Sequence, residues 1–247
     1  MTGALPLTGE RTVPGIPQEN YWFRRHEVVY QSLAPRCAGR FVLEAGCGEG
    51  YGADLLCRSA ARILALDYDA HTAGHVARRY PHVPVVRGNL ANLPLRSCSV
   101  DAVLTLQVIE HLWDQPQFLR ECHRVLTPGG ELLVSTPNRL TFSPGRDIPL
   151  NPFHTRELTG DELTGLLAAA GFTVTNMAGL RHGARLRALD AEHGGSVVDA
   201  QVAASLAGLP WPDRLRSDVA SVTCADFALS TADIDSSLDL VAIGVRS

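Results

Sequence analysis

Two histidines and a glutamate in this chain carry side chains that can act as acids or bases. Glu110 and His111 directly follow an apolar run at residues 100–106, and His154 lies in the loop after a second apolar run at residues 131–136. If both runs are parallel strands, the three side chains come from the same edge of a sheet, where sites form in folds of this kind. Histidine titrates in the range that a general base needs, so His154 is the first candidate for that role.

A glycine-rich loop predicts a nucleotide site at the same edge. Residues 41–43 form a short apolar run typical of a buried strand, and glycines then occupy every second position from 46 to 50 before a helical segment. A loop between the carboxyl end of a strand and the amino end of a helix is the usual nucleotide site of a doubly wound sheet. A dinucleotide fingerprint would need glycine at position 51, where this chain has Tyr51, so the spacing disfavours a nicotinamide dinucleotide.

Apolar runs alternate with helical patterns along most of the chain. This alternation predicts βαβ units and an α/β fold with a mostly parallel sheet. Pro84 within the third run favours an edge position for that strand. Seven strands are expected, at residues 41–43, 62–67, 83–87, 100–106, 131–136, 172–177 and 239–245. Four main helices are expected, at residues 21–33, 70–79, 117–126 and about 159–170. Asn20 is expected to cap the first, and Thr159 or Asp161 to begin the last.

Two segments lie outside the alternating pattern. Residues 1–35 comprise a Gly/Pro/Thr-rich arm and one helix, and they precede the main domain at residues 36–247. An insertion at about residues 180–230 separates the last two strands, and it carries at least two helical stretches and a candidate short strand at residues 225–229. We expect the first helix and the insertion to cover the active-site face as lids, and the arm and insertion to become ordered when ligands bind.

Composition argues against several classes of partner. The net charge is -4 and no Lys/Arg run stands out, so no nucleic-acid partner is expected. No apolar stretch reaches the roughly 18 residues of a membrane span, and the first residues lack a signal-peptide pattern, which together predict a cytoplasmic protein with no membrane partner. The six cysteines include no C-x-x-C pair, as expected for buried thiols in a reducing compartment.

The glycine loop and two later segments together resemble the class I S-adenosylmethionine (SAM) methyltransferases. The loop reads Glu-x-Gly-x-Gly-x-Gly from residue 44, residues 101–112 resemble the family's strand-four motif with Glu-His near its end, and Pro-Gly-Gly at residues 128–130 resembles its turn into strand five. The resemblance implies a Rossmann-like sheet with an antiparallel last strand, and SAM as the cofactor. It implies cofactor-binding roles for Glu44, Ala45, Gly46, Cys47, Gly48, Asp67, Tyr68, Asn89, Leu90 and Gln107.

The resemblance also implies which part of the cofactor each of these residues contacts. Glu44 would organise the methionyl end of SAM, Asp67 would accept both ribose hydroxyls, and Tyr68 would pack on the adenine ring. Asn89 stands where the family usually has aspartate, and its amide oxygen can still accept a hydrogen bond from the adenine amine.

Further segments resemble sugar-acting members of the family. The loop after the fifth expected strand contains His-x-Arg-Glu at residues 154–157, and Gly-Glu-Arg at residues 9–11 resembles an arm of bacterial methyltransferases encoded among polysaccharide genes. Together with residues 20–26, 108–114 and 141–147, the chain resembles methyltransferases associated with methylglucose lipopolysaccharide synthesis. The resemblance implies O-methylation of a glucose-based oligosaccharide or polysaccharide precursor, with His154 as the base that takes the hydroxyl proton. Substrate contacts would come from Arg11, Tyr21, Trp22, Arg25, His26, Trp113 and Asn138.

Several alternatives stay open from sequence. The Glu-His corner with a later loop histidine also resembles the Mg²⁺ site of small-RNA 2′-O-methyltransferases, which would make Glu110, His111 and His154 metal ligands. Gln107 stands where that family has a carboxylate, a ligand that Mg²⁺ prefers. The acceptor could instead be a quinone, phenol or carboxylate, or the chain could bind SAM without catalysis. The oligomeric state is open, with a dimer among the options.

Overall fold

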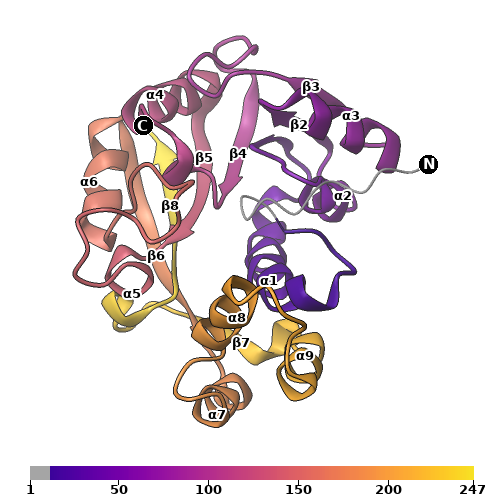
Figure 1. Cartoon of the computed structure of the whole chain (residues 1–247). Helices are drawn as coiled ribbons and strands as arrows, with labels where there is room; N and C mark the ends of the chain where they lie inside the picture. Colours follow the sequence, from indigo (N-terminus) through magenta and orange to yellow (C-terminus); the bar gives the residue numbers. More distant parts are fainter. Residues whose placement is uncertain (1–11) are drawn as a thin grey trace.

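Eight strands of the described chain, residues 12–247 of the computed structural model, form one mixed sheet (Figure 1). The strands are β1 (Phe41–Ala45), β2 (Arg62–Asp67), β3 (Val85–Arg87), β4 (Val100–Leu106), β5 (Leu126–Pro137), β6 (Phe172–His182), β7 (Phe227–Ser230) and β8 (Asp239–Arg246). Their order across the sheet is β3-β2-β1-β4-β5-β8-β6-β7. The first five in this order are parallel, and β8 is antiparallel to both of its neighbours.

The sheet differs from the expected one in its number of strands. Seven were predicted, whereas the described residues contain eight. The eighth is β7, which pairs with β6 at the edge of the sheet and overlaps the candidate short strand at residues 225–229. The turn expected at residues 128–130 is instead a bulge inside β5, where the pairing with β4 shifts between Val100 and Ala102. The edge position of β3 and the antiparallel last strand are both confirmed.

Alternating side chains build a hydrophobic core on each face of the sheet. Successive strand residues point to opposite faces, so Val42 packs into one core and Leu43 into the other, and Leu133 and Leu132 divide in the same way. The core that contains Val42 is covered by α1 (Asn20–Cys37), α2 (Tyr51–Leu56) and α3 (Ala70–Arg79). The opposite core is covered by α4 (Gln115–Val125) and α6 (Gly160–Ala169).

The starts of these helices follow from local chemistry. Asp69 caps α3, and Thr159 caps α6 in a reciprocal capping box with Glu162, because each side-chain oxygen accepts from a backbone N–H of the first turn. Asn20 was expected to cap α1, but it is the first residue inside that helix. Its amide instead donates to the carbonyl oxygens of Val219, Ala220 and Val222, so it joins α1 to the insertion.

The insertion forms three helices beyond the carboxyl ends of β4 and β5, next to α1 (Figure 1). They are α7 (Ala184–Glu192), α8 (Val197–Leu206) and α9 (Asp213–Ala220). The Tyr21 hydroxyl donates to Nε2 of His182 at 2.7 Å, and His182 Nδ1 donates to Asp190 at 2.7 Å, which ties α1 to β6 and α7. Within residues 12–247, no helix combines the length and apolar character needed to cross a membrane.

Candidate active site

The glycine-rich loop turns sharply at the carboxyl end of β1. Gly46 has a φ of 85°, and a Cβ at this position would lie 2.6 Å from a methyl group of Val108, so only glycine fits there. The Gly48 N–H donates to one carboxylate oxygen of Asp67 at 3.0 Å, and the Asp69 N–H donates to the other at 3.0 Å. These bonds fix the loop against the end of β2, as a nucleoside-binding corner requires.

Glu44 is buried at the end of β1, next to this loop. The Tyr30 hydroxyl donates to its Oε1 at 2.7 Å, whereas its Oε2 is buried without a hydrogen-bond partner among residues 12–247. Burial raises the pKa of this carboxyl to about 8. A Cβ on Gly52 would lie 2.4 Å from Oε1, so the helix can approach the carboxyl only with glycine there. An unsatisfied buried oxygen of this kind is suited to binding a cationic ligand group.

The other predicted cofactor residues lie at the same edge because β1 to β4 are parallel neighbours. Tyr68 and Asn89, after β2 and β3, are exposed and accessible to a ligand. Gln107 directly follows β4 in the left-handed region, with a φ of 56°, and its amide donates to Ser135 Oγ at 3.3 Å. The remaining three, Ala45, Cys47 and Leu90, are buried.

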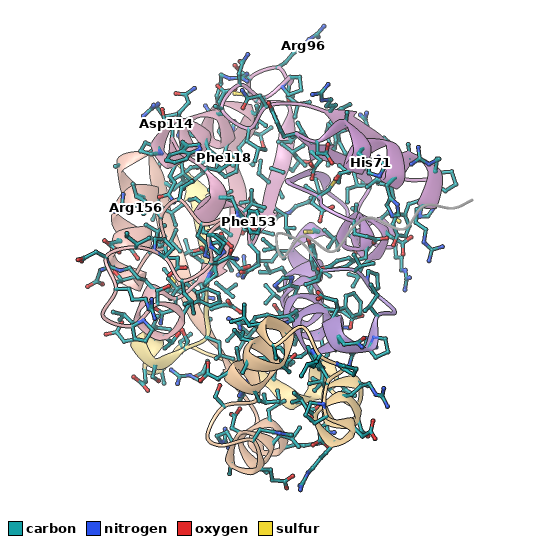
Figure 2. The ribbon with its side chains drawn as sticks, viewed as in Figure 1. His71, Arg96, Asp114, Phe118, Phe153 and Arg156 are labelled. Carbon is teal, nitrogen blue, oxygen red and sulfur yellow. The ribbon has the colours of Figure 1, made fainter. Side chains whose placement is uncertain are left out.

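A cleft of about 460 Å³ adjoins the carboxyl end of β4. Its walls come from α1, from the residues after β4, from α8, and from the loop that follows α5 (Arg139–Phe142). The lining is largely apolar or aromatic, and includes Trp22, Leu150 and Phe153. In Figure 2, Phe153 lies toward the middle of the molecule, while Arg156 from the same loop lies at its outer side.

His154 is held at this cleft by a hydrogen-bonded pair with Glu157. Its Nδ1 lies 2.7 Å from Glu157 Oε1, and the two side chains are 4% and 1% exposed. An ionised carboxylate only accepts hydrogen bonds, so Nδ1 carries the proton and Nε2 presents a lone pair. The Asn151 amide donates to Nε2 at 3.1 Å, and its oxygen accepts the Phe153 N–H, which fixes the amide's orientation. His154 thus has the tautomer that a general base needs. The Asn151 amide lies where the hydroxyl of an acceptor would donate to Nε2.

Glu110 and His111 lie on one short turn directly after β4, beside His154. Glu110 is fully buried and accepts a hydrogen bond from the Thr136 hydroxyl at 3.0 Å. Burial, with a further contribution from nearby carboxylates, raises the pKa of Glu110 to about 8. His111 Nδ1 donates to the Phe153 carbonyl at 3.0 Å, and the two imidazole rings meet edge to face with centroids 4.9 Å apart.

These three side chains form a compact donor set. One potential ligand atom from each of Glu110, His111 and His154 lies within 4.8 Å of the others. Two imidazoles and one carboxylate fit a divalent transition-metal ion such as Mn²⁺ or Zn²⁺ better than Mg²⁺, which prefers oxygen ligands. A cation would also stabilise the charged form of Glu110, which burial disfavours. The set can therefore serve as a base with a neighbouring acid, or as a metal site.

Three of the predicted acceptor residues line the cleft. Trp22, Arg25 and His26 project from α1 into its wall. The Arg25 guanidinium lies over the Trp22 ring, 5.3 Å from its centroid, and forms a bidentate pair with Asp239. Burial lowers the pKa of His26 to about 4, so this imidazole is neutral at pH 7. Because the Arg25 guanidinium is already paired with Asp239, Trp22 and His26 are better placed to contact an acceptor.

The structure places three other predicted acceptor residues away from the cleft lining. Tyr21 is buried in the hydrogen-bonded chain to His182. Asn138 is also buried, where it caps α5 and donates to three carbonyl groups between residues 234 and 237. Trp113 is 93% exposed and does not line the cleft. Arg11 lies outside the described residues.

Two residues at the centre of the site were not assigned a role from sequence. Glu157 was visible as the last residue of the His-x-Arg-Glu pattern, and its spacing of three residues from His154 was the signal that could have identified the pair. Asn151 gave no such signal, because its contact with His154 depends on the path of the loop. Val202 and Leu206 of α8 reach the cleft from the insertion, and no sequence pattern indicated which face of that helix would do so.

Comparisons with known proteins identify the family. The sequence model of one protein family, described as a methyltransferase domain, matches residues 43–134, from β1 into β5. The chain belongs to the class I SAM-dependent methyltransferases, and SAM is its cofactor. A probable SAM-dependent methyltransferase of Mycolicibacterium smegmatis is 64% identical over 249 aligned residues, which cover 100% of this chain and 97% of that protein. A probable SAM-dependent methyltransferase of Mycobacterium tuberculosis is 63% identical over 246 residues, 98% of this chain and 90% of its own.

A solved structure shares the fold over nearly the whole chain. A SAM-dependent methyltransferase of Thermotoga maritima superposes with a TM-score of 0.60 at 19% identity, covering 92% of this chain and 93% of its own. At this identity the likeness concerns the fold alone. The family assignment therefore rests on the close relatives, and the fold agrees with it.

Replacing Glu44 with glutamine should separate the stability cost of this carboxyl from its part in cofactor binding. Between pH 4.5 and about 8 the unfolded chain has lost this proton while the folded chain keeps it, so wild-type stability falls as the pH rises through that window. The variant lacks this ionisation. Its free energy of unfolding in urea, relative to that of the wild type, should therefore increase from pH 4.5 to pH 8.

The same variant should bind SAM about tenfold or more weakly in calorimetry, because a charge-assisted hydrogen bond to the cofactor is lost. The wild type serves as the control at each pH, since Glu110 contributes its own pH dependence equally to both proteins. Unchanged affinity would show that Glu44 does not contact the cofactor.

Proposed function

We propose that this methyltransferase transfers the SAM methyl group to a hydroxyl of a glucose-based oligosaccharide or polysaccharide precursor. The observation that carries the proposal is the His154–Glu157 pair, because its geometry presents an imidazole lone pair inside the cleft next to the carboxyl end of β4. A hydroxyl is a poor nucleophile while protonated, and a positioned base removes that obstacle. The sequence resemblance to sugar-acting members of the family supports the choice of acceptor.

In the proposed reaction, SAM held by the loop after β1 and by Glu44 would supply the methyl group to the acceptor oxygen and give up its sulfur–methyl bond. The hydroxyl proton passes to Nε2 of His154, and the products are a methyl ether and S-adenosylhomocysteine. Glu157 keeps Nδ1 protonated before the transfer and stabilises the imidazolium that forms. The acceptor hydroxyl must displace the Asn151 amide from Nε2, and the cleft walls then hold it in position for attack.

The lining of the cleft is compatible with a sugar ring. Trp22 and Phe153 offer aromatic faces on which the apolar face of a pyranose can pack, while His26 and Asn151 offer polar groups to its hydroxyls. The walls formed by α1 and α8 come from the segments expected to act as lids. We therefore extend the proposal to the first helix and the insertion at about residues 180–230, which would cover the bound acceptor.

A metal-assisted version of the same reaction is the second candidate. It is favoured by the 4.8 Å cluster of Glu110, His111 and His154 and by the raised pKa of Glu110. The bound ion would make a coordinated hydroxyl more acidic. In this version Glu157 and the Phe153 carbonyl, which accept from the two Nδ1 atoms, would orient the imidazoles as outer partners.

A turnover assay with and without chelation tests the proposal. SAM consumption should depend on a glucose-based oligosaccharide, with one methyl ether formed per S-adenosylhomocysteine, and phenolic or carboxylate acceptors should give little or none. Turnover that survives exhaustive chelation supports His154 as the base alone, whereas turnover lost on chelation and restored by Mn²⁺ or Mg²⁺ supports the metal-assisted version. Methylation of phenols in preference to sugars would overturn the choice of acceptor.

A further inference from the structure

A second cluster of potential metal ligands lies at the opposite edge of the sheet from the cleft. It consists of Asp54 on α2, Cys57 at the end of that helix, and His82 after α3. One potential ligand atom from each lies within 4.8 Å of the other two, and His82 Nε2 is 2.8 Å from Asp54 Oδ1. The cluster borders a cavity of about 530 Å³ whose wall includes Phe41, the first residue of β1.

The local fold brings these three atoms together for separate reasons. Asp54 and Cys57 are three residues apart at the end of one helix, and residues at that spacing share a face. The Cys57 thiol donates a hydrogen bond to the Asp54 carbonyl at 3.0 Å, which keeps the thiol on that face. His82 approaches from the loop between α3 and β3, so the third donor comes from a different element. The donors thus join the helix that follows the glycine loop to the loop that precedes β3.

The chemistry of the donors favours one class of ion. A thiolate, an imidazole and a carboxylate are the ligand types of zinc sites, where bonds of about 2.0–2.3 Å place tetrahedral donors roughly 3.3–3.7 Å apart. The observed separations are compatible with that value, because one donor pair is 2.8 Å apart and all three donor atoms lie within 4.8 Å of one another. Mg²⁺ and Ca²⁺ are disfavoured by sulfur. Arg58 pairs with the other oxygen of Asp54: its guanidinium lies 3.5 Å from Oδ2.

We propose that Asp54, Cys57 and His82 bind Zn²⁺, with the fourth position open to water or to a small ligand in the adjoining cavity. On binding, the Cys57 thiol releases its proton to solvent and the sulfur coordinates as thiolate. The His82 proton that Nε2 donates to Asp54 is given up to solvent while Nδ1 takes one up, so the neutral imidazole changes tautomer and its Nε2 lone pair binds the ion. The ion would link the end of α2 to the loop before β3, and so stabilise the part of the fold that follows the glycine-rich loop. This site is independent of the proposed acceptor and of the cleft donors.

A cobalt titration distinguishes this site from the cleft, because only a site with a thiolate produces a sulfur-to-cobalt charge-transfer band. Added to the reduced, tag-free, full-length protein, Co²⁺ should produce that band, and Zn²⁺ should remove it by displacement. Cys57→Ser should abolish the band, and His82→Gln should weaken Co²⁺ binding at least tenfold. The matched control, Cys98→Ser, removes an exposed thiol elsewhere and should behave like the wild type.

Thermal unfolding supplies a second readout. Zn²⁺ should raise the melting temperature of the wild type and of Cys98→Ser, and it should raise that of Cys57→Ser by clearly less, because an ion that binds only the folded state stabilises it. The proposal is overturned if wild-type protein gives no thiolate band, or if the band persists in Cys57→Ser. The absence of a thiolate band is measured on the wild type alone, so this test does not depend on whether a variant folds.

Discussion

Replacing His154 with alanine is expected to lower the turnover number for methyl transfer by about a hundredfold to ten-thousandfold, the usual contribution of a general base. SAM affinity should stay within about twofold of wild type, because within residues 12–247 the hydrogen bonds of the His154 ring go to Glu157 and Asn151, and neither belongs to the cofactor loop after β1. Single-turnover measurements with saturating acceptor, paired with SAM calorimetry, would separate the two quantities. Added imidazole should restore part of the activity if the missing group is a base.

Glu157→Gln is the variant that sharpens this test. It keeps the size of the side chain but removes the charge that fixes the His154 tautomer and stabilises the imidazolium, so turnover should fall while acceptor and SAM affinity hold. The control is Asp161→Asn, the same carboxylate-to-amide change at an exposed position of α6 outside the cleft lining. Normal turnover in His154→Ala would contradict both the base and the metal-assisted versions, since both need this imidazole.

The strands and the strand-end residues were predictable because their signals are local. The apolar run at residues 100–106 is β4, and it fixes where Glu110 and His111 must emerge. Parallel neighbours in the sheet then bring Glu44 and His154 to the same edge, as the spacing implied. β7 was harder to predict because it is a short edge strand with only Phe227 buried, so its pattern is weak.

The roles of residues on α1 could not be predicted, because they depend on contacts with distant segments. Tyr21 and Arg25 were expected to contact the acceptor. The structure shows that Tyr21 bonds His182, and that Arg25 lines the cleft while it pairs with a residue 214 positions away. Which face of a helix meets which partner is set by packing, and the sequence of the helix alone does not specify it. The tautomer of His154 was likewise fixed by Glu157 and Asn151, whose approach depends on the loop.

Arg25→Met is expected to destabilise the fold by about 3–5 kcal/mol, the cost of breaking a buried ion pair by removing one partner. Arg25 and Asp239 are 3% and 1% exposed, and two nitrogen–oxygen distances of 2.7 Å make the pair bidentate. The variant would leave the Asp239 carboxylate buried without its guanidinium, where α1 meets the start of β8. Urea denaturation at pH 7 measures the loss.

Two further variants decide whether the uncompensated charge is the cause. Arg24→Met removes the neighbouring arginine, whose pair with Glu27 is partly exposed, and should cost less than about 1 kcal/mol. The double variant Arg25→Met/Asp239→Leu removes both charges from the same position, and it should recover most of the lost stability because apolar side chains can replace a buried pair. If the double variant is as unstable as Arg25→Met, the loss comes from packing of the long side chain against Trp22 rather than from a stranded carboxylate.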